Sequence, residues 1–204
     1  ETIYGSTFEM FNDFIAFLNG LELIDKTIKT CLYKGIEIDS GSFKFPKTTG
    51  KTHRTVAHLI DLGIDNSEIH NLLFNNNSFE SLQLLGKALQ NMKLLKAQKT
   101  AYITLTQEEL DRYHFQKGDT EGIVNYGLSI KDIIFAAIFI ENKEEGIIKI
   151  SLRSIGDFDV NQLAREHFHG GGHINASGGK SLVSMKETIN NFEQIVKNNH
   201  KLKF

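Results

Sequence analysis

The segment HFHGGGHINASGG, residues 167–179, places three consecutive glycines beside histidines. Glycines let backbone N–H groups approach a ligand with no Cβ in the way, which suits a phosphate group. The INAS stretch that follows is expected to open a short helical turn, whose N-terminus favours an anion. His173 can donate a hydrogen bond to a phosphate oxygen or protonate a leaving group. The segment therefore predicts an anion-binding site.

Two other interpretations of the same segment remain open. The glycines can simply turn the chain. Alternatively, His167, His169 and His173 can form a zinc site, although adjacent glycines would brace such ligands poorly.

A second candidate is the arginine in IIKISLRS, residues 147–154. Side chains alternate between the two faces of a strand. If Ile148, Ile150 and Leu152 face the core, then the opposite face carries Lys149, Ser151 and Arg153. A guanidinium at the end of a strand can donate two hydrogen bonds to a phosphate or carboxylate. The alternative is a surface arginine on a solvated sheet face.

The composition sets limits on the class of protein. A net charge of −2 over 204 residues gives no general attraction to nucleic acid or membranes, so any anion site must be local. The one cysteine, Cys31, excludes a disulfide framework within the chain, and its apolar neighbours favour a buried thiol. No apolar run approaches the ~18–20 residues that span a bilayer, and the first residues do not resemble a signal peptide. We therefore expect a cytoplasmic protein with no membrane partner.

The first half of the chain is expected to be mostly helical. Phe8, Phe11, Ile15 and Leu18 repeat at helical spacing behind a cap at Ser6 or Thr7. The remaining expected elements are a helix over residues 21–30, a strand over 31–39, a helix over 49–63 closed by Gly63, a helix capped by Asp65 and Glu68, and a long helix over 78–97.

After Lys99 strands alternate with helices. Residues 101–105 read as a strand, and Thr106 with Glu109 caps the helix after it. The apolar run 133–140 suits a central strand covered on both faces, and it forms a hairpin with 147–154. Asp159 and Ser184 are expected to cap the two remaining helices. The pattern predicts an α/β fold with a second domain that begins near Lys99.

Three segments together resemble a known family. They are SLRS at 151–154, FHGGGHINASGG at 168–179 and GDTEGIVNYGLSI at 118–130. In this combination the chain resembles the DHH-family phosphoesterases, in particular the branch of RecJ-like exonucleases and NrnA-type oligoribonucleases and pAp phosphatases.

The resemblance implies the domain organisation. Members of this branch join a catalytic DHH domain through a helical linker to a smaller, mixed-sheet α/β DHH-associated domain that binds substrate. The implied division is a C-terminal remnant of the catalytic domain over 1–63, a linker over 64–98 and the DHH-associated domain over 99–204.

The resemblance also implies roles for individual residues. The family's phosphate- and nucleotide-binding positions correspond to Arg153, Ser154, Gly170, Gly171, Gly172 and His173, and His173 is also expected to assist catalysis. The stretch LYKGIEIDSGSFKFP resembles a metal-binding motif of the family, which assigns Asp39 as a ligand of Mn²⁺ or Mg²⁺. From the residues alone, a turn cap with Ser40 and Gly41 is the favoured interpretation of Asp39. His53 or Arg54 either faces the cleft or lies on a solvated face.

The chain departs from the family pattern because the other metal-binding motifs, including the DHH triplet, do not occur in it. The resemblance therefore implies a two-metal centre only in a longer protein, and we expect the isolated chain to be unable to hydrolyse phosphoesters. The substrate expected for the full-length enzyme is short RNA or a nucleotide such as pAp, and a homodimer is compatible with the sequence. The alternatives are a non-catalytic nucleotide- or RNA-binding module and a polyphosphate or pyrophosphate hydrolase.

Overall fold

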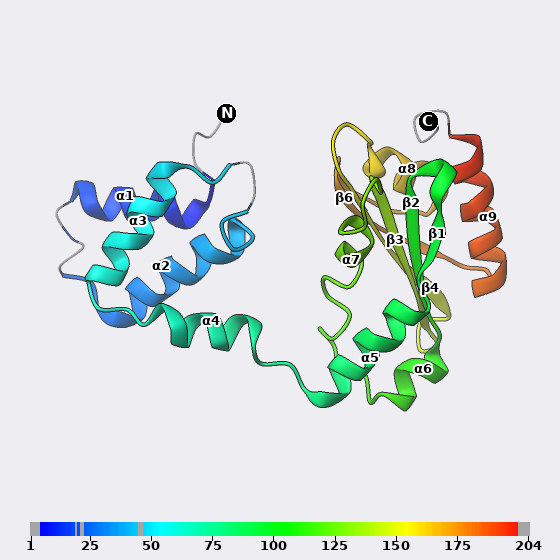
Figure 1. The fold of residues 1–204 in the computed structure, drawn as a ribbon, viewed down its shortest axis with the longest axis horizontal. Coiled ribbons are helices and arrows are strands. Elements are labelled where there is room, and N and C mark those ends of the chain that lie inside the picture. Colours follow the sequence, from blue (N-terminus) through cyan, green and yellow to red (C-terminus); the bar gives the residue numbers. More distant parts are fainter. Residues whose placement is uncertain (1–4, 19, 21–22, 45–46, 200–204) are drawn as a thin grey trace. The chain divides into compact units, whose positions relative to one another are not determined.

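Helices build the N-terminal part of the protein in the computed structural model, which describes residues 5–18, 20, 23–44 and 47–199 (Figure 1). They are α1 (Thr7–Phe17), α2 (Lys26–Asp39), α3 (Gly50–Asp61) and α4 (Asn66–Phe74). Residues 1–76 form one compact unit and residues 77–204 a second. The core of the first unit comprises Leu32, Tyr33, Ile36, Val56, Leu59, Ile64 and Ile69.

The prediction of a strand over residues 31–39 was wrong, because this stretch lies in α2. Asp25 caps the helix by accepting a hydrogen bond from the Ile28 N–H at 2.8 Å. The buried Leu32, Tyr33 and Ile36 then follow at helical spacing on one face. Cys31 lies on the other side of this helix and is exposed, so the expectation of a buried thiol was also wrong. The helix predicted over 21–30 is the start of α2, with residues 21 and 22 outside the described part of the chain.

Helix α1 forms as predicted behind Ser6, whose side chain accepts a hydrogen bond from the Phe8 N–H. The residues that are buried on this helix differ from the apolar residues that the spacing suggested. Glu9 and Asn12 are buried, whereas Phe11 and Phe14 are exposed. The Glu9 carboxylate is oriented inward by hydrogen bonds from the hydroxyl of Thr52 on α3.

A mixed six-stranded sheet forms the centre of the second unit, in the order β1-β2-β3-β4-β6-β5. Its strands are β1 (Lys93–Leu95), β2 (Thr100–Leu105), β3 (Phe135–Asn142), β4 (Ile147–Ser154), β5 (Gly171–His173) and β6 (Ala176–Ser181). Strand β2 is parallel to β3, and the other neighbouring pairs are antiparallel. The predicted α/β class, the central strand and the β3–β4 hairpin are confirmed.

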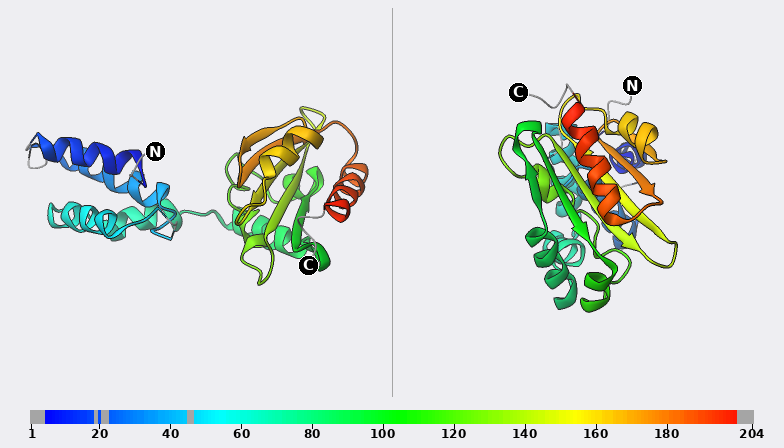
Figure 2. Two further views of the ribbon diagram at one scale, coloured as in Figure 1. Left: turned by 90° about the horizontal axis from the view of Figure 1, so that it is seen from above. Right: turned by 90° about the vertical axis from the view of Figure 1, so that its right-hand side faces the viewer.

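Helices α8 (Val160–His167) and α9 (Met185–Asn198) lie against one face of this sheet (Figure 2). They pack on residues that alternate along β3 and β4: Phe135, Ala137, Phe139, Ile148, Ile150 and Leu152. The opposite face is covered by α5 (Phe79–Gln90), α6 (Gln107–Arg112) and α7 (Asn125–Leu128). The apolar cluster on that side takes its strand residues from β2 and β3, namely Ile103, Leu105, Ala136 and Ile138.

The long helix predicted over residues 78–97 ends at Gln90. The side chain of Asn91 donates hydrogen bonds to the Thr104 carbonyl and to Glu109, which ties the end of α5 to β2 and α6. Residues 93–95 then pair with β2 as an edge strand. The boundary between the compact units therefore falls at residues 76 and 77, inside the stretch assigned to the linker, and α5 belongs to the second unit.

The caps predicted from the sequence are confirmed in this second unit. Thr106 and Glu109 form the capping box of α6, Asp159 caps α8 and Ser184 caps α9. In the described part of the chain, the helices are too short and too polar to span a membrane.

Candidate functional site

Arg153 and His173 lie in one row across three strands of the second unit. Ala176 of β6 pairs with Arg153 of β4 on one side and with His173 of β5 on the other. Paired residues of antiparallel strands point to the same face of a sheet, and neighbouring strands are about 4.8 Å apart. A small alanine therefore separates two side chains that donate hydrogen bonds, with their Cα atoms roughly 10 Å apart.

The surface around this row is built from small residues. The next row on the same face consists of Ser151, Gly178 and Gly171. This face is the one that α5, α6 and α7 cover over β2 and β3. In the described part of the chain, the apolar cluster under these helices takes its strand residues from β2 and β3 alone. The residues of β4, β5 and β6 on this face are exposed or half-buried, and we call the surface that they form the open face: Ser151, Arg153, Gly171, His173, Ala176 and Gly178.

The guanidinium of Arg153 is held at the edge of the open face. One Nη1–H donates to the Leu152 carbonyl oxygen at 2.9 Å. Burial lowers the pKa of this guanidinium, but arginine remains charged in proteins. The remaining N–H groups of the fork are available to a phosphate or carboxylate. The alternation predicted for residues 147–154 is confirmed, because Ile148, Ile150 and Leu152 are buried.

The expected helical turn after His173 is absent from the described structure, and residues 171–181 form the β5–β6 hairpin instead. Glycines on both strands permit this pairing. A Cβ on Gly170 would lie 2.0 Å from the Gly178 carbonyl oxygen, and one on Gly172 would lie 2.5 Å from the Ala176 carbonyl oxygen. At Gly171, by contrast, the nearest atom would be 3.6 Å away, an ordinary contact.

Two asparagines that sequence reasoning missed hold the hairpin in place. The Asn161 Oδ1 on α8 accepts hydrogen bonds from the Gly172 N–H and from Arg165. The Asn175 amide donates to the Ser154 hydroxyl and to the Gly156 carbonyl oxygen. Asn175 occupies a two-residue turn, where asparagine is favoured, but its partners depend on strand register.

Ser154 serves this structural role with its hydroxyl buried. Its Oγ donates to the Phe158 carbonyl oxygen at 2.6 Å and accepts from Asn175. Ser154 also belongs to the face opposite to Arg153. A direct contact between Ser154 and substrate stays a prediction, which the buried hydroxyl does not favour.

The three-histidine zinc site finds no support. Among the residues with described positions, no group of three His, Cys, Asp or Glu side chains is arranged to hold a metal ion. His167 instead approaches Glu166 at 3.8 Å, and His173 projects from β5.

Asp39 is the last residue of α2, in the first unit, and does not follow a strand. Its Oδ2 accepts a hydrogen bond from the Ser6 hydroxyl at 2.7 Å. It lines a cavity of about 10 Å³ together with Gly5, Ser6, Ser40, Lys47, Thr48 and Thr52. Among the described residues that line this cavity, Asp39 is the single carboxylate. The described residues therefore do not amount to a two-metal centre, and the role of Asp39 as a metal ligand stays a prediction.

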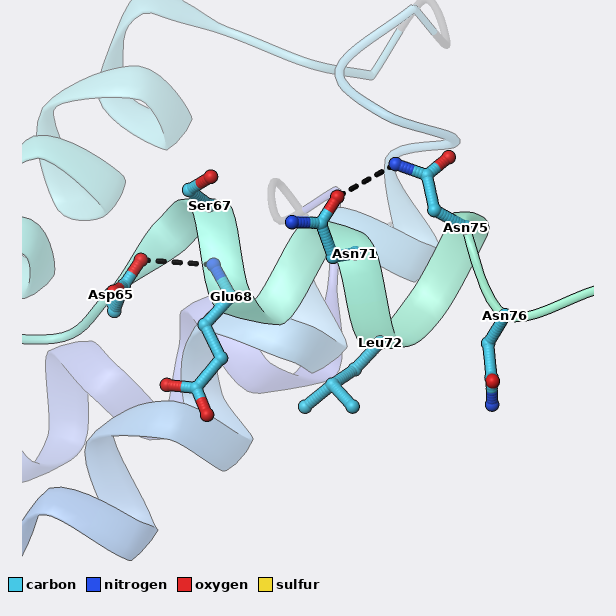
Figure 3. A pocket seen from close by; sticks show the side chains of 7 residues that line it. All are labelled: Asp65, Ser67, Glu68, Asn71, Leu72, Asn75 and Asn76. Carbon is cyan, nitrogen blue, oxygen red and sulfur yellow. Dashed lines mark hydrogen bonds between the residues drawn. The ribbon is translucent and has the colours of Figure 1, made fainter.

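Other candidate positions in the first unit contribute no convergent chemistry. His53 and Arg54 are exposed on α3, and the His53 ring packs 5.4 Å from that of Phe43. A surface hollow beside α4 is lined by Leu72 and by polar side chains of residues 65–76 (Figure 3). Its Asp65 and Asn71 accept hydrogen bonds from the Glu68 N–H and the Asn75 amide, so both act within the helix.

Comparisons with known proteins found a matching family model and similar proteins. A family model described as the DHHA1 domain matches residues 98–199. The probable bifunctional oligoribonuclease and PAP phosphatase NrnA of Streptococcus mutans is 29% identical over 195 residues, which cover 96% of this chain and 60% of that protein. NrnA of Bacillus subtilis is 31% identical over 156 residues, covering 76% of this chain and 48% of that protein.

Among solved structures, an exopolyphosphatase-related protein from Bacteroides fragilis matches with a TM-score of 0.91 and 38% identity. The match covers 96% of this chain and 57% of that protein. The chain therefore spans between about half and three fifths of the length of these relatives.

Proposed function

Because the chain belongs to the DHH family of phosphoesterases, in its NrnA-type branch, we propose that it carries the substrate-binding half of an enzyme that hydrolyses short oligoribonucleotides or nucleotide phosphates such as pAp. The observation that carries this proposal is the row of Arg153, Ala176 and His173 on the open face. It places two groups that can bind a phosphate on one sheet face, with small residues between them.

The proposed roles follow from the chemistry of these groups. Arg153 neutralises a phosphate and fixes its orientation through two parallel hydrogen bonds. His173 donates a further hydrogen bond from the other side of Ala176. Together these contacts hold the substrate in one orientation for reaction.

The relatives' names indicate phosphoester hydrolysis, and we propose that the longer protein uses Mn²⁺ or Mg²⁺ for it, with Asp39 as one ligand. Such ions would activate water and neutralise the charge of the reacting phosphate. Since the described residues do not form a metal centre, we expect the isolated chain to show no turnover of pAp or short RNA with manganese. Measurable turnover would contradict this expectation.

Binding of pAp to the purified chain tests the proposed site, with EDTA present to prevent turnover. Arg153→Ala and His173→Ala should each weaken binding by about 1–3 kcal/mol, the usual contribution of a hydrogen bond to a charged group. Arg112→Ala is the matched control, because Arg112 is exposed on α6 in an ion pair with Glu108. Unchanged affinity in both site variants would show that phosphate does not bind here.

A non-catalytic nucleotide-binding module is the second candidate function. It is favoured by the same lack of a three-ligand metal group among the described residues. One measurement distinguishes the two candidate functions. It compares hydrolysis by a protein of the relatives' full length with hydrolysis by the same protein carrying Asp39→Ala. If the unmodified full-length protein is active and Asp39→Ala abolishes that activity, the result supports the enzyme. If the full-length protein is inactive both with and without the substitution, the result supports the binding module.

A further inference from the structure

Two exposed isoleucines lie close in the chain to Arg153 and His173. Ile155 continues the alternation of Ser151 and Arg153 along β4, and its N–H donates to the Ile134 carbonyl oxygen at 2.9 Å, which extends the β3–β4 ladder. Ile174 directly follows His173 in the turn between β5 and β6. The two side chains are 51% and 56% exposed, so each presents apolar surface to solvent beside a hydrogen-bonding group.

Hydrogen bonds fix these two isoleucines in neighbouring backbone segments. The Ser154 N–H donates to the Asn175 carbonyl oxygen at 3.1 Å, and the Asn175 amide donates to the Gly156 carbonyl oxygen at 2.8 Å. The Ile174 carbonyl oxygen accepts from the Val160 N–H at the start of α8. The turn of the hairpin is thereby tied to the residues on both sides of Ile155. An apolar surface held this firmly is suited to a ligand, because little conformational entropy is lost on binding.

The spacing indicates the shape of that ligand. Two residues along a strand correspond to about 6.6 Å, so apolar surface begins one such step beyond Arg153. A ligand that fits both parts has an anionic group and, a short distance from it, a flat apolar group. A nucleotide has this construction, whereas inorganic phosphate and polyphosphate have the anionic part alone.

We propose that Ile155 and Ile174 form a subsite for the nucleobase of the nucleotide whose phosphate is bound by Arg153 and His173. This inference rests on the proposed function, because it places the base relative to that phosphate. It assigns the site to nucleotides in preference to polyphosphate or pyrophosphate. The contact is apolar and without hydrogen bonds to the base edge, so it discriminates weakly among the four bases.

The experiment compares AMP with ribose 5-phosphate, which lacks the base, by calorimetry on the purified chain with EDTA present. The unmodified chain should bind AMP roughly tenfold more tightly than ribose 5-phosphate, as expected from the apolar surface buried by one base. In the double variant Ile155→Ser/Ile174→Ser, affinity for AMP should fall to that for ribose 5-phosphate, which should not change. Leu182→Ser is the matched control, since Leu182 follows β6 in the same unit and is 65% exposed.

The outcomes separate this inference from the proposed function. If the unmodified chain binds neither ligand, the phosphate site itself is wrong. If it binds both equally, or if the double variant retains its preference for AMP, the nucleobase subsite is wrong and the phosphate site stands. Ile155→Thr/Ile174→Thr keeps the β-branched side chains that favour the extended backbone. If both double variants lose affinity for AMP and for ribose 5-phosphate to the same extent, the nucleobase subsite is wrong. The isoleucines would then act by supporting the fold of the hairpin.

Discussion

At Gly170 an added Cβ would lie 2.0 Å from the Gly178 carbonyl oxygen, whereas at Gly171 the nearest atom would lie 3.6 Å away. The first glycine is required by the close approach of β5 to β6. The second is not required by any contact within the described hairpin. The Cβ of an alanine there would lie beside the side chains of Asn161 and Arg165 on α8.

Alanine substitutions at these two positions should therefore have different effects. Gly170→Ala should lower the free energy of unfolding by about 1–3 kcal/mol, because the backbone of β6 must move. Gly171→Ala should leave the melting temperature nearly unchanged, because its Cβ would make ordinary contacts with the side chains of Asn161 and Arg165 on α8. Thermal melts on both variants test this pair. Equal losses of stability in the two variants would contradict this difference.

A buried tyrosine produces a second effect at the scale of single residues. The Tyr102 hydroxyl donates to the Glu193 carboxylate of α9 at 2.6 Å. This hydrogen bond, assisted by Lys197, lowers the pKa of Glu193 below its ordinary value of 4.5. Burial, together with the same carboxylate, raises the pKa of Tyr102 well above its ordinary value. The pair thus links β2 to α9 most strongly while Glu193 is ionised.

The lowered pKa predicts how stability depends on pH. A carboxyl whose pKa is lower in the folded state stabilises the fold above its unfolded pKa, and this contribution is lost as the pH falls through the folded pKa. Tyr102→Phe should cost about 0.5–1.5 kcal/mol at pH 7. The difference in free energy of unfolding between Tyr102→Phe and the unmodified chain should decrease below about pH 4.5, because Glu193 becomes protonated. Urea denaturation at several pH values measures this difference. A difference that stays constant down to pH 3 would mean that Glu193 is not the partner that matters.

At the scale of elements, local signals were sufficient for some predictions and insufficient for others. The caps at Asp159 and Ser184 were predictable because a cap bonds to backbone two or three residues away. Strand β1 and the β5–β6 hairpin were missed although each pairs with the strand next along the chain, because their short or glycine-rich sequences show no alternation. The helix over residues 31–39 was read as a strand from its apolar residues, whereas its buried face belongs to a core shared with α3. The sheet face on which Arg153 lies could be predicted from the alternation of apolar and polar residues along 147–154 alone. Its proximity to His173 and Ile174 required the register of β4, β6 and β5.

Helix α1 leads to a prediction about its two faces. Its polar Glu9 and Asn12 are buried, whereas Phe14 is 58% exposed. Phe14→Ser should therefore change the free energy of unfolding of the first unit by less than about 0.5 kcal/mol, as expected for a surface position. Leu59→Ala in α3, a fully buried core position, should cost about 2–5 kcal/mol. Urea denaturation compares the two, and equal losses would mean that the aromatic face of α1 contributes to the core.

At the scale of the whole molecule, each compact unit closes its own core. The apolar cluster of the first unit lies within residues 32–69, and the two clusters of the second unit begin at Leu84. The residues proposed to bind phosphate and base, including Arg153, Ile155, His173 and Ile174, all belong to the second unit. The phosphate- and base-binding functions should therefore be carried by residues 77–204 alone.

Limited proteolysis tests this division. The connection between the units runs from Asn75, the C-cap of α4, to Ser78, the N-cap of α5. Because such connections open more easily than packed helices, a protease of broad specificity should cleave first near residues 75–78. The C-terminal fragment should keep the melting transition of its sheet and bind AMP within about threefold of the intact chain, since no proposed contact is removed. A fragment that folds but loses AMP affinity by more than about tenfold would show that residues of the first unit contribute to nucleotide binding.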